Sequence, residues 1–341
     1  MTGKIAIEEH WASASFREYT ARSVSGFGGM SRIERRLADI EEMRLPEMDK
    51  CGIEMAILSL TAEGIQAEPD ARRSPGRARQ ANDELARVVE KHPKRFAAFA
   101  ALPLHDATAA ANELERAVKE LNFKGAMVNG FQTAGDGSTI EYLDHPKFIP
   151  LWERVEALNV PVYLHPRDAH LSQQLIYEGR PELIGPAWGW AVETGTHALR
   201  ILFGGVFDRF PKAMLILGHM GESIPFIMHR IESRYRLTSR GAELQKPVRQ
   251  YFRENFYITT SGQHRTQVLL NGLLEVGAER ILFAADYPFE SSTEAAEWLD
   301  TCPISDADRE KIGRSNAERL FRLDLGSPAQ AHAQSKPLSG A

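Results

Sequence analysis

Two ionisable side chains near the start of the sequence are spaced so that they could act together. The segment KIAIEEH, residues 4–10, begins with alternating apolar residues and ends in Glu8, Glu9 and His10. Because side chains two positions apart on a strand share a face, Glu8 and His10 point one way and Glu9 the other. A carboxylate and an imidazole directed at one point suit either a corner of a metal site or an acid–base pair.

Two further ionisable residues end apolar segments later in the chain. His165 follows VPVYL, and Asp286 follows RILFAA. With Glu8 and His10 they form a mixed nitrogen and oxygen ligand set that suits Zn²⁺ or Mn²⁺. Four unrelated polar residues at strand ends are the alternative, but their joint occurrence at the first, fifth and eighth predicted strands favours the metal site. The fourth strand ends in Asn129 and offers no bridging lysine, so we expect one metal ion.

A third histidine lies in the short sequence LGHMGE. There an apolar run, a glycine and His219 make a tight exit from the sixth predicted strand. Glu222, three residues later, could accept a hydrogen bond from one ring nitrogen and fix the tautomer. The pair is therefore a candidate for proton transfer. A packed core histidine, with Glu222 as an acidic residue at a helix start, is the alternative.

Aromatic residues near the same strand ends could wall a binding pocket. Trp188 and Trp190 lie in the connection PAWGWAVE after the fifth predicted strand, and Phe289 lies in DYPFE after the eighth. Such rings either pack against helices or contact a flat ligand. His264, after the seventh strand, is left equally open. Arg230 lies in a helical pattern, where a surface charge is the default interpretation.

The segments that must position these residues are eight short, mostly apolar runs separated by longer stretches of helical period. Short apolar strands suit a parallel sheet that is buried on both faces. Eight strand–helix units in 341 residues predict a (β/α)8 barrel with insertions over its carboxyl face, where such barrels carry their active sites. A doubly wound sheet is the alternative, but EEHW stands where its glycine-rich phosphate loop would follow the first strand. The predicted strands are 4–10, 54–60, 96–102, 124–130, 160–166, 213–219, 255–261 and 280–286.

Apolar residues at helical spacing predict the helices between these strands. One such series runs through Ile33, Leu37 and Ile40 and is stopped by Gly52. The last helix begins with SDAD, where Ser305 could cap the helix and Asp308 could bond back to it. Further helices are predicted near 81–89, 114–121, 147–158, 191–209, 222–236, 264–276 and 306–321.

Composition narrows the class of protein. With 43% hydrophobic residues the chain can bury a core, and a net charge of −5 gives no reason to expect a nucleic-acid or membrane partner. Cys51 and Cys302 form no CxxC pattern, and the sequence has neither a signal segment nor an apolar run of bilayer length, so we expect a cytoplasmic location. Residues 1–325 are expected to form one catalytic domain, and the small, polar residues 326–341 a mobile tail.

Six segments resemble the amidohydrolase superfamily and, more narrowly, its hydroxybenzoate decarboxylase branch. These segments are IAIEEH, VNG, VPVYLHPR, LGHMGE, ENFYITTSG and RILFAADYPFE. The resemblance extends to about Leu325 and implies a (β/α)8 barrel, a homotetramer and one divalent metal ion. It implies that the metal ligands are Glu8, His10, His165 and Asp286.

The resemblance also implies roles outside the metal ligands. His219 matches the family's strand-six histidine, and Glu222 matches its orienting partner. Asn129, Arg230 and Phe289 match positions that line the substrate pocket.

Two features refine the resemblance. Hydrolytic members usually begin with HxH, whereas this chain has ExH, which favours the decarboxylases. Some dihydroxybenzoate decarboxylases have ExA, so His10 favours the γ-resorcylate type. Residues 12–28 match no family pattern, and we expect them to form a loop over the barrel mouth.

These features together predict metal-dependent, reversible, non-oxidative decarboxylation of an ortho-hydroxybenzoate. The favoured substrate is 2,6-dihydroxybenzoate (γ-resorcylate), giving resorcinol and CO2, with 2,3-dihydroxybenzoate and salicylate as alternatives. A Zn²⁺, Mn²⁺ or Mg²⁺ ion would chelate a carboxylate oxygen and the adjacent phenolate oxygen. Asp286 would protonate the ring carbon, and His219 with Glu222 would assist. We expect no organic cofactor, because the ring itself accepts the electrons.

Two hypotheses from other functional classes stay open at this point. A metal-dependent amidohydrolase or lactonase would use the same ion to activate water, with Asp286 as the general base. The second hypothesis is a barrel that binds a metal ion without catalysis. The presence of His219 beside the ligand set disfavours this hypothesis.

Overall fold

The structure is a computed structural model that describes residues 3–12, 14–20, 30–134, 137 and 139–325. The predicted tail, 326–341, lies outside the described residues, as does most of the segment expected to form a loop over the mouth. No helix among the described residues is long and apolar enough to cross a membrane.

Parallel strands occupy all eight predicted positions, and most are shorter than the sequence suggests. The third position is split into two short strands, because the chain passes from one sheet to another at Phe99. The strands are β1 (Lys4–Trp11), β2 (Ile53–Leu60), β3 (Phe96–Ala98), β4 (Ala100–Ala101), β5 (Ala126–Asn129), β8 (Val162–His165), β9 (Leu215–Leu217), β10 (Phe256–Thr259) and β11 (Ile281–Leu282). A small antiparallel pair, β6 (Gln132–Thr133) and β7 (Ile140–Glu141), lies in an insertion.

The strands form two parallel sheets that are joined at both ends. One sheet has the order β1-β2-β3, and the other has the order β11-β10-β9-β8-β5-β4. Phe99 links β3 to β4 along the chain. At the other side, β1 meets the segment after β11: the N–H of Ile7 donates to Phe283 O (3.2 Å), and the N–H of His10 donates to Tyr287 O (2.8 Å). These contacts connect the first and last strand positions, as a barrel requires.

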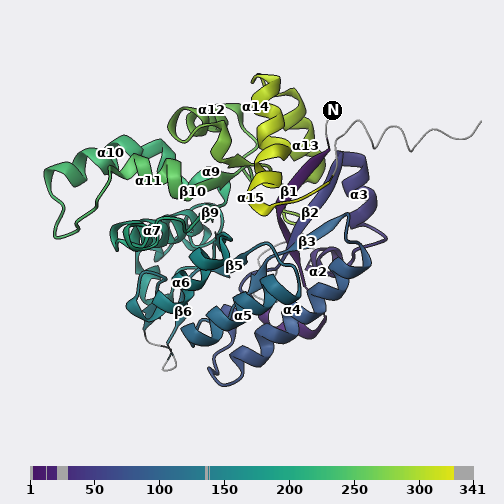
Figure 1. Cartoon of the computed structure of the whole chain (residues 1–341), viewed down its shortest axis with the longest axis horizontal. Helices are drawn as coiled ribbons and strands as arrows, with labels where there is room; N and C mark the ends of the chain where they lie inside the picture. The colour runs from purple at the N-terminus through teal and green to yellow at the C-terminus, as the bar shows by residue number, and fades with distance from the viewer. Residues whose placement is uncertain (1–2, 13, 21–29, 135–136, 138, 326–341) are drawn as a thin grey trace, which may run out of the picture.

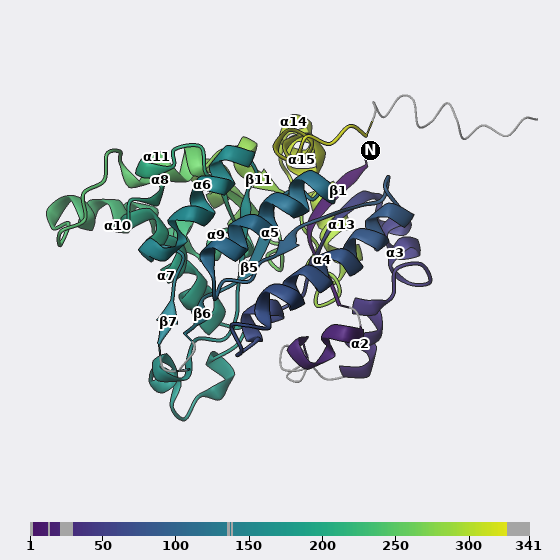
Figure 2. The ribbon, with the colours of Figure 1, turned by 60° about the horizontal axis from the view of Figure 1, so that its bottom comes forward.

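Helices follow the strands in sequence order and cover the outside of the strands (Figure 1). Figure 2 shows that α2 and the long insertion after β8 lie at the end toward which β1 runs. The helices are α2 (Met30–Ala38), α3 (Arg44–Cys51), α4 (Ser74–Lys91), α5 (Ala107–Glu120), α6 (Ile149–Leu158), α7 (Gly189–Phe203), α8 (Val206–Arg209), α9 (His219–Glu222), α10 (Ile224–Leu237), α11 (Val248–Asn255), α12 (Thr266–Glu275), α13 (Ser292–Thr301), α14 (Asp306–Glu310) and α15 (Asn316–Phe321).

Local signals in the sequence set several helix ends. Gly52 follows α3 in the left-handed region (φ +64°), and its N–H donates to Asp49 O, so the predicted stop is confirmed. The single helix predicted before it is wrong, because Ile33 and Leu37 belong to α2, which ends at Ala38, and Ile40 lies between α2 and α3. The hydroxyl of Ser305 accepts from the N–H of Asp308 (3.1 Å), so the predicted cap is also confirmed. The final helix differs from the prediction, because a π turn, Lys311–Ser315, separates α14 from α15.

The apolar residues form two cores, one on each side of the strands. The larger core lies between the strands and the surrounding helices. The smaller core fills the interior, where Ile5, Ile7, Phe99 and Tyr163 are buried together, with Phe321 of α15 packed against them. The ring of strands is therefore packed at this level, as in a (β/α)8 barrel.

Candidate active site

A bulge in β1 turns its ionisable residues toward the interior. Ile7 belongs to the interior core, so strict alternation would place Glu9 inside and Glu8 and His10 outside. The pairing of β1 with β2 shifts by one residue between Ala6 and Glu9, as in a β-bulge. Glu8 and His10 consequently share the interior face, as their spacing predicts.

Four predicted ligands from three strand positions converge at the carboxyl end of the strands. The Nε2 atom of His10 lies 3.1 Å from Asp286 Oδ1. The Nε2 atom of His165 lies 3.4 Å from Glu8 Oε1, and the His10 and His165 rings are 4.7 Å apart, edge to face. All four side chains are buried. This geometry brings two imidazoles and two carboxylates to one point.

The donor set fits a divalent cation. One oxygen of Glu8, Oε2, is held by the hydroxyls of Tyr163 and Thr259. Its other oxygen, Oε1, is buried and has no hydrogen-bond partner among the described residues. Ligand atoms of Glu8, His10 and His165 lie within 4.8 Å of one another. An unpaired carboxylate oxygen beside imidazole nitrogens is what a Zn²⁺ or Mn²⁺ ion would satisfy.

His219 lies beside this cluster, and Glu222 holds its ring in place from the side that faces away from the cluster. Its Nε2 atom is 3.9 Å from Glu8 Oε1 and 3.8 Å from Asp286 Oδ2. Its Nδ1 atom is 2.7 Å from Glu222 Oε1, so the predicted pairing is present. The intervening turn has positive φ throughout, and a side chain at Gly221 (φ +81°) would lie 2.9 Å from Ile258.

The electrostatics of the cluster separate its members. Burial lowers the pKa of His165 well below its usual value, which keeps the imidazole neutral and able to bind a metal. Burial alone would raise the pKa of Asp286, but His10 and His219 outweigh it and lower this pKa. Burial also opposes protonation of His219, yet the charges of Glu222 and Glu8 raise its pKa well above the usual value.

A cavity of about 360 Å³ opens beside the cluster. Trp188, Trp190 and Phe289 line it together with the metal-site histidines, so these three rings lie where the sequence suggested pocket walls. Phe289 is 5.3 Å from the His10 ring, and the indole N–H of Trp190 donates to Asp168 Oδ1. The space suits one substituted aromatic ring.

Three residues singled out in the sequence lie outside this cavity. Asn129 is buried, and its backbone N–H donates to Gln66 Oε1 (3.2 Å). Arg230 is exposed on α10. His264 packs beside Trp298, with ring centres 5.7 Å apart. The structure does not bring any of the three to the wall of the cavity.

Other site residues were not singled out in the sequence. Tyr163 holds Glu8 through its hydroxyl, and it could have been found because it stands two positions before His165 on the same strand face. Arg44 donates to the backbone carbonyl of His10. Burial raises the pKa of Glu9, on the other face of β1, to about 8, although the charge of Arg44 opposes the shift. No local pattern marks this contact between a helix and the back of β1.

A family model described as amidohydrolase matches residues 10–323 of the chain. The chain belongs to the amidohydrolase family. This amidohydrolase is 49% identical over 332 residues to a γ-resorcylate decarboxylase of Rhizobium sp. (strain MTP-10005), with 95% of this chain and 99% of the relative covered. It is 48% identical over 329 residues to a γ-resorcylate decarboxylase of Rhodococcus jostii (strain RHA1), with 95% and 100% covered.

Solved structures agree with the fold of this amidohydrolase. A crystal structure of 2,6-dihydroxybenzoate decarboxylase complexed with 2,6-dihydroxybenzoate matches it with a TM-score of 0.91 at 48% identity, covering 95% of this chain and all of the other. A crystal structure of the dihydroxybenzoic acid decarboxylase of Polaromonas sp. JS666, with bound manganese and the inhibitor 2-nitroresorcinol, matches it with a TM-score of 0.90 at 47% identity. The match covers 94% of this chain and 97% of the other. The predicted amidohydrolase-type barrel is confirmed.

Proposed function

We propose that this amidohydrolase catalyses the reversible, non-oxidative decarboxylation of 2,6-dihydroxybenzoate to resorcinol and CO2. The observation that carries the proposal is the 49% identity to a γ-resorcylate decarboxylase across 95% of the chain. The arrangement of ionisable groups supports the same class of reaction. No specific observation favours a hydrolase.

The proposed metal site consists of Glu8, His10, His165 and Asp286. Their buried nitrogen and oxygen donors suit one divalent ion, and we propose Zn²⁺ or Mn²⁺, with Mg²⁺ as a weaker candidate because of the histidines. When bound, the ion would neutralise the substrate's carboxylate and phenolate charges and fix the orientation of the ring. We propose no organic cofactor, because the ring accepts the electron pair released with CO2.

The reaction needs one proton at the ring carbon that loses CO2. We propose Asp286 as the donor, since its carboxylate faces the cavity. Its lowered pKa means that it is ionised before the reaction and must first receive the proton. His219 can supply it, because its pKa is raised and its Nε2 atom lies 3.8 Å from Asp286 Oδ2. Glu222 holds His219 in place and stabilises its charged form.

The aromatic residues of the cavity are the proposed substrate contacts. Trp188, Trp190 and Phe289 would enclose the ring, and stacking or edge contacts to them favour a flat ligand. Asn129 and Arg230, whose contact with the substrate the family resemblance implies, do not line this cavity of the single chain, and their contact stays a prediction.

We further propose that residues 1–325 act as one catalytic domain of a cytoplasmic homotetramer. Exposed apolar side chains in the insertion after β8 support assembly: Leu171 and Leu175 are 77% and 75% exposed. Cys51 and Cys302 are both buried and unpaired, in keeping with a reducing compartment. The net charge of −5 supports a small-molecule substrate and not a nucleic acid.

A substrate panel tests the proposal. The manganese-loaded protein is incubated with 2,6-dihydroxybenzoate, 2,3-dihydroxybenzoate, salicylate and an aryl lactone, and the products are separated by chromatography. We expect resorcinol from the first acid at a rate at least tenfold above any other conversion. Faster turnover of 2,3-dihydroxybenzoate or salicylate would replace the proposed substrate, and turnover of the lactone alone would replace the reaction class.

A further inference from the structure

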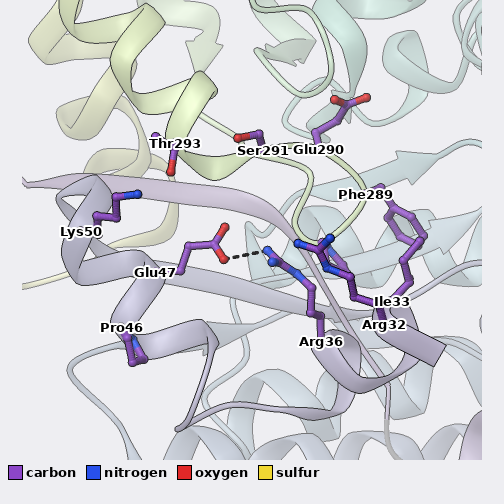
Figure 3. Close-up of a pocket in the computed structure, with 11 residues that line it drawn as sticks. Arg32, Ile33, Arg36, Pro46, Glu47, Lys50, Phe289, Glu290, Ser291 and Thr293 are labelled. Atoms are coloured by element: carbon purple, nitrogen blue, oxygen red, sulfur yellow. Dashed lines mark hydrogen bonds and ion pairs between the residues drawn. The ribbon is translucent and has the colours of Figure 1, made fainter. Parts of the chain in front are cut away.

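A second, larger cavity lies on the other side of the segment that carries Phe289. It has a volume of about 640 Å³ and lies between α2, α3 and the residues that connect β11 to α13. Figure 3 shows side chains from all three parts directed into it. Phe289 and Glu290 line both this cavity and the proposed active-site cavity. We call it the outer cavity.

The outer cavity has a surplus of positive charge. Arg32, Arg36 and Lys50 line it, against two carboxylates, Glu47 and Glu290. Arg36 donates to Glu47 Oε2 (2.7 Å), so these two charges offset each other. Arg32 and Lys50 have no ion-pair or hydrogen-bond partner within the described ranges, and both are exposed. One surplus positive charge favours a monoanion over a dianion, which the two carboxylates would repel.

One guanidinium of the outer cavity is fixed in place before any ligand arrives. Arg36 stacks over the Tyr287 ring at 4.5 Å and is anchored by Glu47. Its Nε atom is buried and out of a ligand's reach, so the outer nitrogens of Arg36 and the exposed guanidinium of Arg32 are the groups that a ligand can contact. Figure 3 shows the guanidinium groups of Arg32 and Arg36 both directed into the cavity. A planar guanidinium with unused donors matches the geometry of a carboxylate.

The remaining wall is apolar with two hydroxyls. Ile33, Pro46 and Phe289 supply apolar surface, which suits a ring and not a fully hydrated ion. Ser291 and Thr293 add hydroxyl groups at the start of α13. A ligand with a flat apolar body and one carboxylate would satisfy the charges and the apolar wall together.

We propose that the outer cavity is a binding site for an aromatic monocarboxylate, separate from the active site and divided from it by Phe289 and Glu290. Inorganic phosphate has no apolar body, and at neutral pH it carries more than one negative charge, whereas the outer cavity has one surplus positive charge. Acetate has the charge without the ring. Benzoate-like acids combine both features.

Photolabelling locates the site in solution. The full-length protein is illuminated with 4-azidobenzoate, an aromatic carboxylate whose nitrene inserts into nearby bonds, and the labelled peptides are mapped by mass spectrometry. We expect label within 32–50, because α2 and α3 line the outer cavity and not the proposed active-site cavity. Excess benzoate should prevent this labelling, whereas acetate and phosphate at the same concentration should not.

Two matched variants complete the test. Arg32→Gln should raise the benzoate concentration that gives half-protection about tenfold, since a hydrogen bond to a charged group is lost. Lys50→Gln should raise it less, because an ammonium makes no bidentate contact. Arg35→Gln, on the same helix but outside the outer cavity, should leave the half-protecting benzoate concentration unchanged. The Arg35 side chain is 69% exposed, and its ion pair with Glu42 is long, at 3.9 Å.

Three results would overturn the proposal. The first is an absence of label in 32–50. The second is equal protection by phosphate, which would assign the cavity to an inorganic anion. The third is the same half-protection in Arg32→Gln and Arg35→Gln. None of these results depends on turnover, so a failure here is distinct from a failure of the proposed decarboxylation.

Discussion

The two ends of the barrel interior are built from the same strands and differ in chemistry. At the amino end, Ile5, Phe99 and Phe321 belong to a buried apolar layer. At the carboxyl end, ionisable side chains face one another across distances of 3.1–3.9 Å. Tyr163 stands between them, with its ring in the apolar layer and its hydroxyl on Glu8. Position along the strand therefore decides whether an interior residue serves stability or chemistry.

The largest expected effect is on the carboxyl end alone. Asp286→Asn removes both a proposed metal ligand and the proposed proton donor, so kcat should fall by about 10³-fold or more. The melting temperature should change little, because this end contributes few apolar contacts. Product formation and thermal unfolding of the same preparation measure both quantities. A folded variant that keeps a tenth of the activity would contradict the assigned role.

The opposite result is expected at the amino end. Phe99→Ala empties a fully buried site beside Phe321 and Tyr163 and should lower the free energy of unfolding by about 3–5 kcal/mol. Activity per folded molecule should fall far less than in Asp286→Asn, because Phe99 touches the cluster only through Tyr163, whose hydroxyl holds Glu8. Denaturant titration gives the first quantity and active-site titration the second. A selective loss of kcat without destabilisation would mean that the two ends are not separable.

A smaller effect is expected at Glu222, which contacts His219 and is not one of the proposed metal ligands. Glu222→Gln keeps the shape but removes the charge that raises the pKa of His219, so kcat should fall by about 10–100-fold. The basic limb of the pH–rate profile should also move to lower pH. Metal content should stay at the wild-type value, which atomic absorption measures. A pH profile identical to the wild type would assign Glu222 to packing only.

The last expected effect is on stability alone and concerns Glu193, a buried carboxyl on α7 that lies outside the ring of strands. Burial raises the pKa of Glu193 to about 8, although Arg167 opposes the shift. The folded state therefore holds this proton more tightly than the unfolded state does. The free energy of unfolding of the protein should fall as pH rises from about 4.5 to about 8, by at most about 1.4 kcal/mol per pH unit. Glu193→Gln should remove that slope. Parallel urea titrations at pH 5 and pH 8 measure it, and an unchanged slope would contradict the assignment.

Much of the carboxyl end could be predicted from sequence because it depends on short-range spacing. The spacing of Glu8 and His10 predicts that they share one face, and each further ionisable residue stands at the end of an apolar segment. The strand ends of a parallel barrel meet at one face, so residues such as His165 and Asp286 were expected to converge.

Features that depend on packing between distant segments were not predictable in this way. The bulge in β1, which makes Glu8 and His10 face inward, arises from pairing with β2 and leaves no mark in the local pattern. The split of the third strand at Phe99 likewise follows from its two different neighbours. The positions of Asn129 and Arg230 outside the cavity wall depend on how β5 and α10 pack.

The most direct test of the central claim is the metal dependence of CO2 release. Metal-depleted protein is reconstituted with increasing Mn²⁺ or Zn²⁺ and supplied with carboxyl-labelled 2,6-dihydroxybenzoate, and labelled CO2 is measured. We predict negligible release without metal and a linear rise that saturates at one ion per chain. Equal release from the metal-depleted protein, or saturation with no CO2 formed, would contradict the account.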